Sequence, residues 1–194
     1  YAGSMQTEGE SDGYLVYALA EEVCTNFGTC DATSGTAQAN EMHLAHAISG
    51  LAHIRAGNCE CANEDLDEIK RWMTVPLIQS MLRYVYKCDP AALDEGGEAC
   101  AEAYAFAAAV LPQINSCDSA AATTVMTNTV PGADVPDGFA AVKAAVESTY
   151  RCMGIQCSDI GGLYDGDSYY SGMEPCSFSP SAAPTYTAAP LSGA

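Results

Sequence analysis

The sequence predicts an all-α fold: a compact, disulfide-stapled bundle of about six helices, with an irregular Gly/Tyr-rich C-terminal segment and an extended tail. Three observations favour this class. Apolar residues recur at helical spacing through most of residues 12–151, few segments alternate with period two, and ten cysteines are spread along the chain. We expect a helical domain over 1–151, a cysteine-stapled extension of it over 152–176, and a tail over 177–194.

The helices are expected in order along the chain. Asn63 and Asp118 have the residue type and position of helix N-caps, Gly57 is a C-terminal stop signal, and Pro76 predicts the start of a new helix after a kink. The Ala-rich helix after residue 97 is expected to end near Pro112. These signals predict helices over 12–24, 36–56, 63–74, 76–88, 97–111, 118–127 and 138–151.

Charge and cysteine content indicate where the protein works. The chain carries 25 acidic and 7 basic residues, a formal net charge of -18, so nucleic acid and anionic membranes would be repelled and cations attracted. The sequence has no CxxC pair of the kind that zinc sites use. It also has no run of eighteen apolar residues, the length that a membrane-spanning helix needs. A start at Tyr1 is what removal of a secretory signal would leave, so we expect a secreted protein with no membrane insertion.

In an oxidising compartment the ten cysteines predict five disulfides, with the pairing left open. The expected disulfide residues are Cys24, Cys30, Cys59, Cys61, Cys88, Cys100, Cys117, Cys152, Cys157 and Cys176.

All three histidines lie in one helical segment, NEMHLAHAISGLAHIR. At 100° per residue, His43, His46 and His53 share an arc of about 80° opposite the Leu44 and Leu51 face, which predicts a helix buried nearly all round. His43 and His46, one turn apart, could chelate a metal with a carboxylate such as Glu102. The alternative is that all three are core or interface histidines, hydrogen-bonded to backbone or tyrosine.

Several stretches resemble the low-iron-inducible periplasmic proteins of microalgae. They are WMTVPLIQSMLRYVYKCD and AYAFAAAVLPQINSCDSAAATTVM, preceded by EEVCTNFGTCD and followed by IQCSDIGGLYD, and together the resemblance spans about residues 14–165. It implies a non-enzymatic protein of iron assimilation, in the extracellular or periplasmic space of a microalga. We therefore expect iron, or another cation, as its ligand. No family ligand is carried over, because no motif assigns one.

A structural subunit of an extracellular filament or surface coat is the second hypothesis. The tail over 177–194 is rich in Pro, Ala, Ser and Thr and cannot build a core of its own. Its large apolar residues are Phe178, Tyr186 and Leu191. We expect them to anchor on another copy of the chain, head to tail, which would give a homo-oligomer or a filament.

Overall fold

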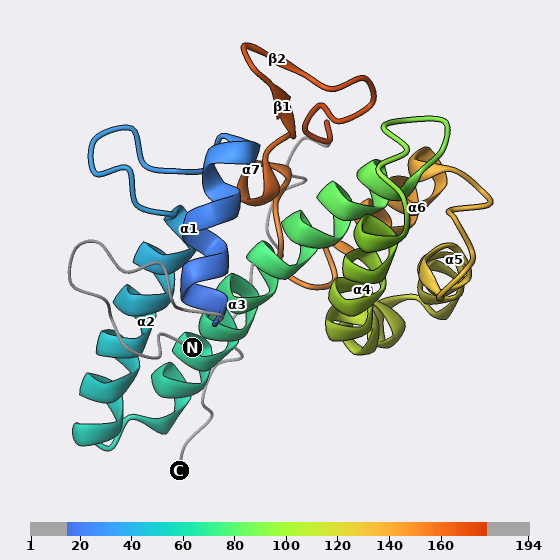
Figure 1. The fold of residues 1–194 in the computed structure, drawn as a ribbon. Helices are drawn as coiled ribbons and strands as arrows, with labels where there is room; N and C mark the ends of the chain where they lie inside the picture. The colour runs from blue at the N-terminus through green and yellow to red at the C-terminus, as the bar shows by residue number, and fades with distance from the viewer. Residues whose placement is uncertain (1–14, 178–194) are drawn as a thin grey trace.

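A computed structural model describes residues 15–177 as a helical protein with one small β-hairpin (Figure 1). Seven helices and two strands lie in this range. Their bounds are α1 Val16–Phe27, α2 Gln38–Arg55, α3 Cys59–Cys88, α4 Gly97–Cys117, α5 Ser119–Thr129, α6 Phe139–Thr149, α7 Cys157–Ile160, β1 Tyr164–Asp165 and β2 Ser168–Tyr169. The predicted all-α fold is confirmed. None of the described helices has an apolar stretch long enough to cross a bilayer.

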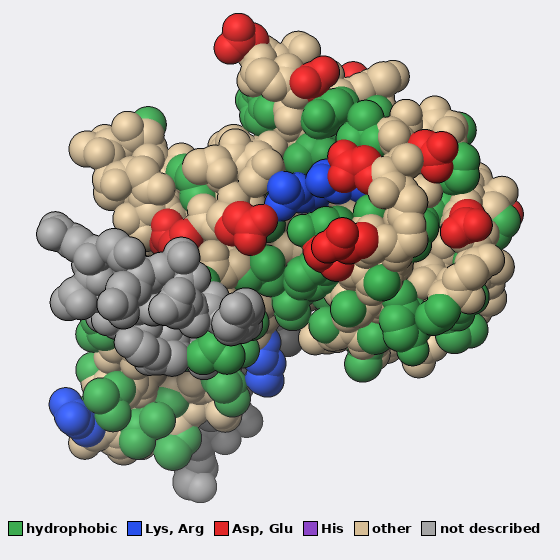
Figure 2. Space-filling view, viewed as in Figure 1, with side chains coloured by type: hydrophobic (Ala, Val, Ile, Leu, Met, Phe, Trp, Pro, Cys, Tyr) green, Lys and Arg blue, Asp and Glu red, His purple; other side chains and the backbone are tan. Residues whose placement is uncertain are grey.

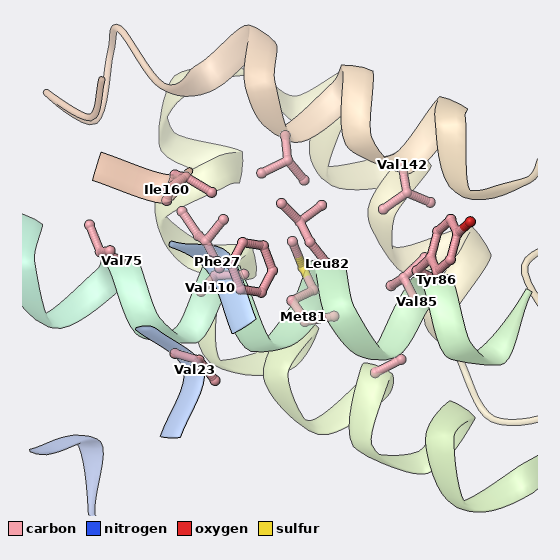
Figure 3. Packing of buried hydrophobic residues seen from close by; sticks show 14 of the residues in the cluster. Val23, Phe27, Val75, Met81, Leu82, Val85, Tyr86, Val110, Val142 and Ile160 are labelled. Carbon is pink, nitrogen blue, oxygen red and sulfur yellow. The ribbon is translucent and has the colours of Figure 1, made fainter. Parts of the chain in front are cut away.

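The 30-residue helix α3 crosses the whole molecule; most of the other helices pack along it, and α5 packs against α4 and α6 (Figure 1). Helices α1 and α2 lie along its N-terminal half, whereas α4, α5 and α6 gather around its C-terminal half. The apolar core is continuous along this helix. Figure 3 shows Phe27 of α1 and Val110 of α4 near Leu82 of α3, and Val142 of α6 further along α3, and all four side chains are buried.

Two of the predicted helix boundaries are wrong. Pro76 lies inside α3 and Pro112 inside α4, so both helices continue past their prolines. A proline removes one backbone hydrogen bond and strains the preceding turn. Pro76 is itself buried, between the apolar neighbours Val75 and Leu77. Tertiary packing on this stretch therefore keeps the helix in one piece despite the local penalty.

Of the two predicted N-caps, one is correct and one is wrong. Asp118 does cap α5, because its Oδ1 accepts the backbone N–H groups of Ala120 at 2.8 Å and Ala121 at 3.2 Å. Asn63 is not a cap, since α3 begins four residues earlier with Asn58 as the N-cap, accepting from the Cys61 N–H at 3.3 Å. Helix α3 thus begins about one turn before the start that its sequence signals predict.

Four disulfides are present: Cys24–Cys30, Cys88–Cys100, Cys117–Cys152 and Cys157–Cys176. The prediction of a fifth is wrong, because Cys59 and Cys61 are free thiols. They lie two residues apart in the first turn of α3, and side chains at i and i+2 of a helix point in different directions. Within the helix they do not face each other, and the other eight cysteines are bonded in pairs.

The expectation that α2 is buried nearly all round is also wrong. Its histidine face packs against α3, but Leu44, Ile48, Leu51 and Ile54 on the rest of the helix are exposed.

Residues 152–177 are irregular apart from α7 and the hairpin, and the Cys157–Cys176 bond closes them. The predicted anchors Phe178, Tyr186 and Leu191 lie outside the described residues, so assembly through the tail stays a prediction.

Candidate functional site

Two histidines of α2 share one carboxylate of α3. Asp65 Oδ1 lies 2.9 Å from His46 Nδ1, and Asp65 Oδ2 lies 2.8 Å from His53 Nδ1. The histidines are seven residues apart, two turns of one helix, and the aspartate sits between them on the neighbouring helix. Asp65 is buried, while His46 and His53 keep about a quarter and a third of their side-chain surface exposed.

Gly50 makes this close approach possible. It lies between His46 and His53 on the same face of α2, and it is buried. A Cβ at position 50 would lie only 3.2 Å from the Cβ of Asp65, closer than ordinary side-chain contacts. The glycine, which costs about 1 kcal/mol of helix propensity relative to alanine, therefore leaves the space into which Asp65 fits.

Asp65 determines which nitrogen of each imidazole faces outward. A carboxylate only accepts hydrogen bonds, so both Nδ1 atoms must carry protons and donate to it. The Nε2 atom of each ring then points away from Asp65. The hydrogen bond from His46, with that from His53, holds the pKa of Asp65 below its usual value although burial opposes this. Asp65 is therefore the ionised acceptor for both rings.

The outward nitrogen of His46 faces a second carboxylate. His46 Nε2 lies 3.9 Å from Glu68 Oε2. The same oxygen accepts from Arg71 at 2.6 and 3.0 Å, and Arg71 in turn donates to Asp159 at 2.9 Å. Burial raises the pKa of Asp159, and the nearby guanidinium opposes that shift. A line of alternating charge thus runs from the histidines to the loop that carries α7.

The structure does not bring together the predicted ligands His43, His46 and Glu102. Within residues 15–177, one set of three His, Cys, Asp or Glu side chains has ligand atoms within 4.8 Å of one another: Cys88, Cys100 and Asp134. Its two cysteines are bonded to each other, so they are not available as thiolates. The predicted ligand set is therefore wrong.

Glu102 and His43 have other surroundings. Glu102 lies on α4 and accepts a hydrogen bond from Tyr84. Burial of Tyr84, and in second place this hydrogen bond, raises the pKa of its phenol to about 12. His43 is half-buried on α2, and burial lowers the pKa of its imidazole. Neither takes part in the contacts of Asp65, whose two oxygens face His46 and His53. Of the predicted set, His46 alone belongs to this site.

The sequence hypothesis missed Asp65 and Glu68. Both lie in a strongly acidic stretch, NEDLDEIK, where no local signal separates a buried carboxylate from a solvated one. One signal was present in α2: a glycine in mid-helix between two histidines, which often marks close approach of another chain segment. It points to a partner, but not to which residue supplies it.

Comparison with known proteins adds no further assignment. No protein-family model matches the chain, and no match was found among the curated proteins or the solved structures. The resemblance to low-iron-inducible proteins therefore stays a prediction.

Proposed function

We propose that this is a secreted, non-enzymatic protein that binds iron or another cation weakly, through His46 Nε2 and the carboxylate of Glu68. The single observation that carries this proposal is the hydrogen bond from His46 Nδ1 to Asp65. Metal-binding histidines almost always donate their second ring nitrogen to a carboxylate or carbonyl, which fixes the tautomer and leaves the other nitrogen free to coordinate. Asp65 supports His46 in this way.

The distance between the two ligand atoms suits a modest rearrangement. Two ligands about 2.1 Å from a tetrahedrally coordinated metal are roughly 3.4 Å apart. His46 Nε2 and Glu68 Oε2 are 3.9 Å apart, so the partly exposed Glu68 side chain would have to close by about half an ångström. Imidazole and carboxylate together suit iron, zinc and related cations.

Weak, exchangeable binding follows from the number of ligands. Two protein ligands leave the remaining coordination positions to water or to a chelating anion. The guanidinium of Arg71 also competes for Glu68, because it donates two hydrogen bonds to the same oxygen. A cation would therefore exchange readily, as expected of a protein that concentrates a metal near a surface and releases it.

Three further facts support the proposal. The net charge of -18 concentrates cations around the molecule. Four disulfides are typical of proteins from oxidising compartments outside the cytosol. The resemblance to low-iron-inducible proteins points to iron in preference to other metals, and to a microalga as the source.

Equilibrium dialysis would distinguish cation binding at His46 and Glu68 from non-specific attraction of cations to the acidic surface. The full chain is dialysed against ferrous iron without oxygen, then against zinc, and compared with His46→Ala and Glu68→Gln. Asp67→Asn is the matched control, because it removes the same charge from the neighbouring, strongly exposed residue. We expect about tenfold weaker binding in the first two variants and less than a twofold change in the control. Equal losses in Glu68→Gln and Asp67→Asn would show that the cation binds only to diffuse charge.

A further inference from the structure

The outer face of α2 carries a regular stripe of exposed residues. Leu44, Ile48 and Leu51 are 52%, 63% and 46% exposed, and Glu41 and Arg55 continue the stripe at its two ends. The steps along the chain are three, four, three and four residues. This is the spacing of the seam of a coiled coil, in which one helix packs lengthwise against another.

Nothing in the described part of the chain covers this stripe. Helix α2 lies at the flank of the molecule, with its opposite face against α3 (Figure 1). In Figure 2 hydrophobic side chains gather over the lower part of this flank, while the visible acidic side chains lie elsewhere on the same face. Apolar side chains repeated on one helix face, without a partner, are typical of an interaction surface.

The charges at the two ends indicate what the partner is. Glu41 and Arg55 are fourteen residues apart, about 21 Å along the helix axis, and Ile48 lies midway between them. No residue from 42 to 54 is Asp, Glu, Lys or Arg. If a second α2 ran antiparallel across a two-fold axis at Ile48, Glu41 would face the second copy's Arg55 at both ends. Leu44 would then lie beside the second copy's Leu51.

We propose that α2 docks antiparallel against α2 of a second copy of this chain, with the two-fold axis passing beside Ile48. The stripe is self-complementary in both shape and charge, as a two-fold interface requires. A parallel pair would instead put Glu41 against Glu41 and Arg55 against Arg55. Two chains of net charge -18 also repel each other least at a surface where, between its two ends, no residue from 42 to 54 of α2 is acidic.

The expected dimer is weak. Helix α2 has 18 residues and a length of about 27 Å, and a single pair of such helices buries less surface than a typical stable interface. We expect monomers at about 1 µM and mostly dimers at about 100 µM, because interfaces at the small end of the size range are weak and transient.

Sedimentation velocity of the full chain over this concentration range is the first test. Cys59→Ser and Cys61→Ser are introduced throughout to exclude disulfide exchange. Glu41→Arg alone and Arg55→Glu alone should each shift the dimer midpoint at least tenfold to higher concentration, and the double reversal should restore it. Met126→Ser, which removes an apolar side chain of similar exposure on α5, should leave it unchanged.

Cross-linking then tests the orientation. In the same Cys59→Ser, Cys61→Ser background, Ile48→Cys places the two introduced thiols beside the two-fold axis. With oxidised glutathione, the two thiols are oxidised to one disulfide and one glutathione disulfide is reduced to two thiols. We expect covalent dimer at least ten times faster than for Met126→Cys.

Three results would overturn the proposal. One is a monomer at all concentrations up to 100 µM. Another is a double charge reversal that dimerises no better than the single ones, although circular dichroism shows it folded. The third is a dimer that is insensitive to charge reversal and is lost when residues 178–194 are deleted, because the tail would then be the interface.

Discussion

Opening the Cys117–Cys152 disulfide should destabilise the protein more than any change to its free cysteines. This bond joins the end of α4 to the segment after α6, and it closes a loop of 35 residues that contains α5 and α6. Cross-linking a loop of that length restricts the unfolded chain and stabilises the fold by about 4 kcal/mol. Cys152 is exposed and Cys117 half-buried, so replacing both by alanine leaves little cavity and tests mainly the cross-link.

The assay is urea denaturation at pH 7 without reductant, followed by far-ultraviolet circular dichroism. Cys117→Ala with Cys152→Ala should lower the free energy of unfolding by about 4 kcal/mol, a large part of the 5–15 kcal/mol of a typical domain. Cys59→Ala with Cys61→Ala removes the same atoms without breaking a bond and should change it by less than about 0.5 kcal/mol. Similar losses in both pairs would refute the assigned connectivity and the loop-entropy reasoning.

Three further predictions follow from burial and titration. In urea without reductant, a thiol reagent should count two thiols per chain, from Cys59 and Cys61; a count of zero would restore the fifth disulfide. Burial lowers the pKa of His43 from its ordinary 6.5, so the unfolded chain binds the proton more readily and stability should fall as pH drops below about 6.5. His43→Gln should flatten that slope, and an unchanged slope would show that His43 is not the group responsible. Met81 is fully buried, so Met81→Ala should cost 2–5 kcal/mol and Met126→Ala, half exposed, under about 1; equal costs would contradict the packing.

The helical fold follows largely from local patterns, whereas its long-range contacts do not. Asp118 and Gly57 are read correctly because a cap or a stop acts within one turn of the chain. Pro76 and Pro112 are misread because packing of their helices against others offsets the local penalty, and no window of sequence contains that packing. Pro76 is itself buried, whereas Pro112 is exposed but lies between the buried residues Val110 and Ile114 of α4.

The candidate site also depends on a long-range contact that local sequence patterns do not predict. The clustering of His46 and His53 on one face of a helix is visible in the sequence, but their partner Asp65 depends on how α2 and α3 pack. The low charge of α2 predicts burial on all sides, yet Leu44 and Ile48 are exposed. An uncharged helix can be apolar because the protein's own core covers it or because a partner does, and the sequence does not separate the two.

The most direct test of the proposed cation site is the state of each imidazole nitrogen when metal is added. Nitrogen-15 spectra of uniformly labelled protein at neutral pH would be recorded while zinc, a diamagnetic substitute for ferrous iron, is titrated in. We predict that the Nε2 resonance of His46 moves while its Nδ1 keeps the proton that it donates to Asp65, and that Glu68→Gln weakens this shift. Zinc binding that leaves the Nε2 resonance of His46 unmoved, or that displaces its Nδ1 proton, would contradict the proposed site.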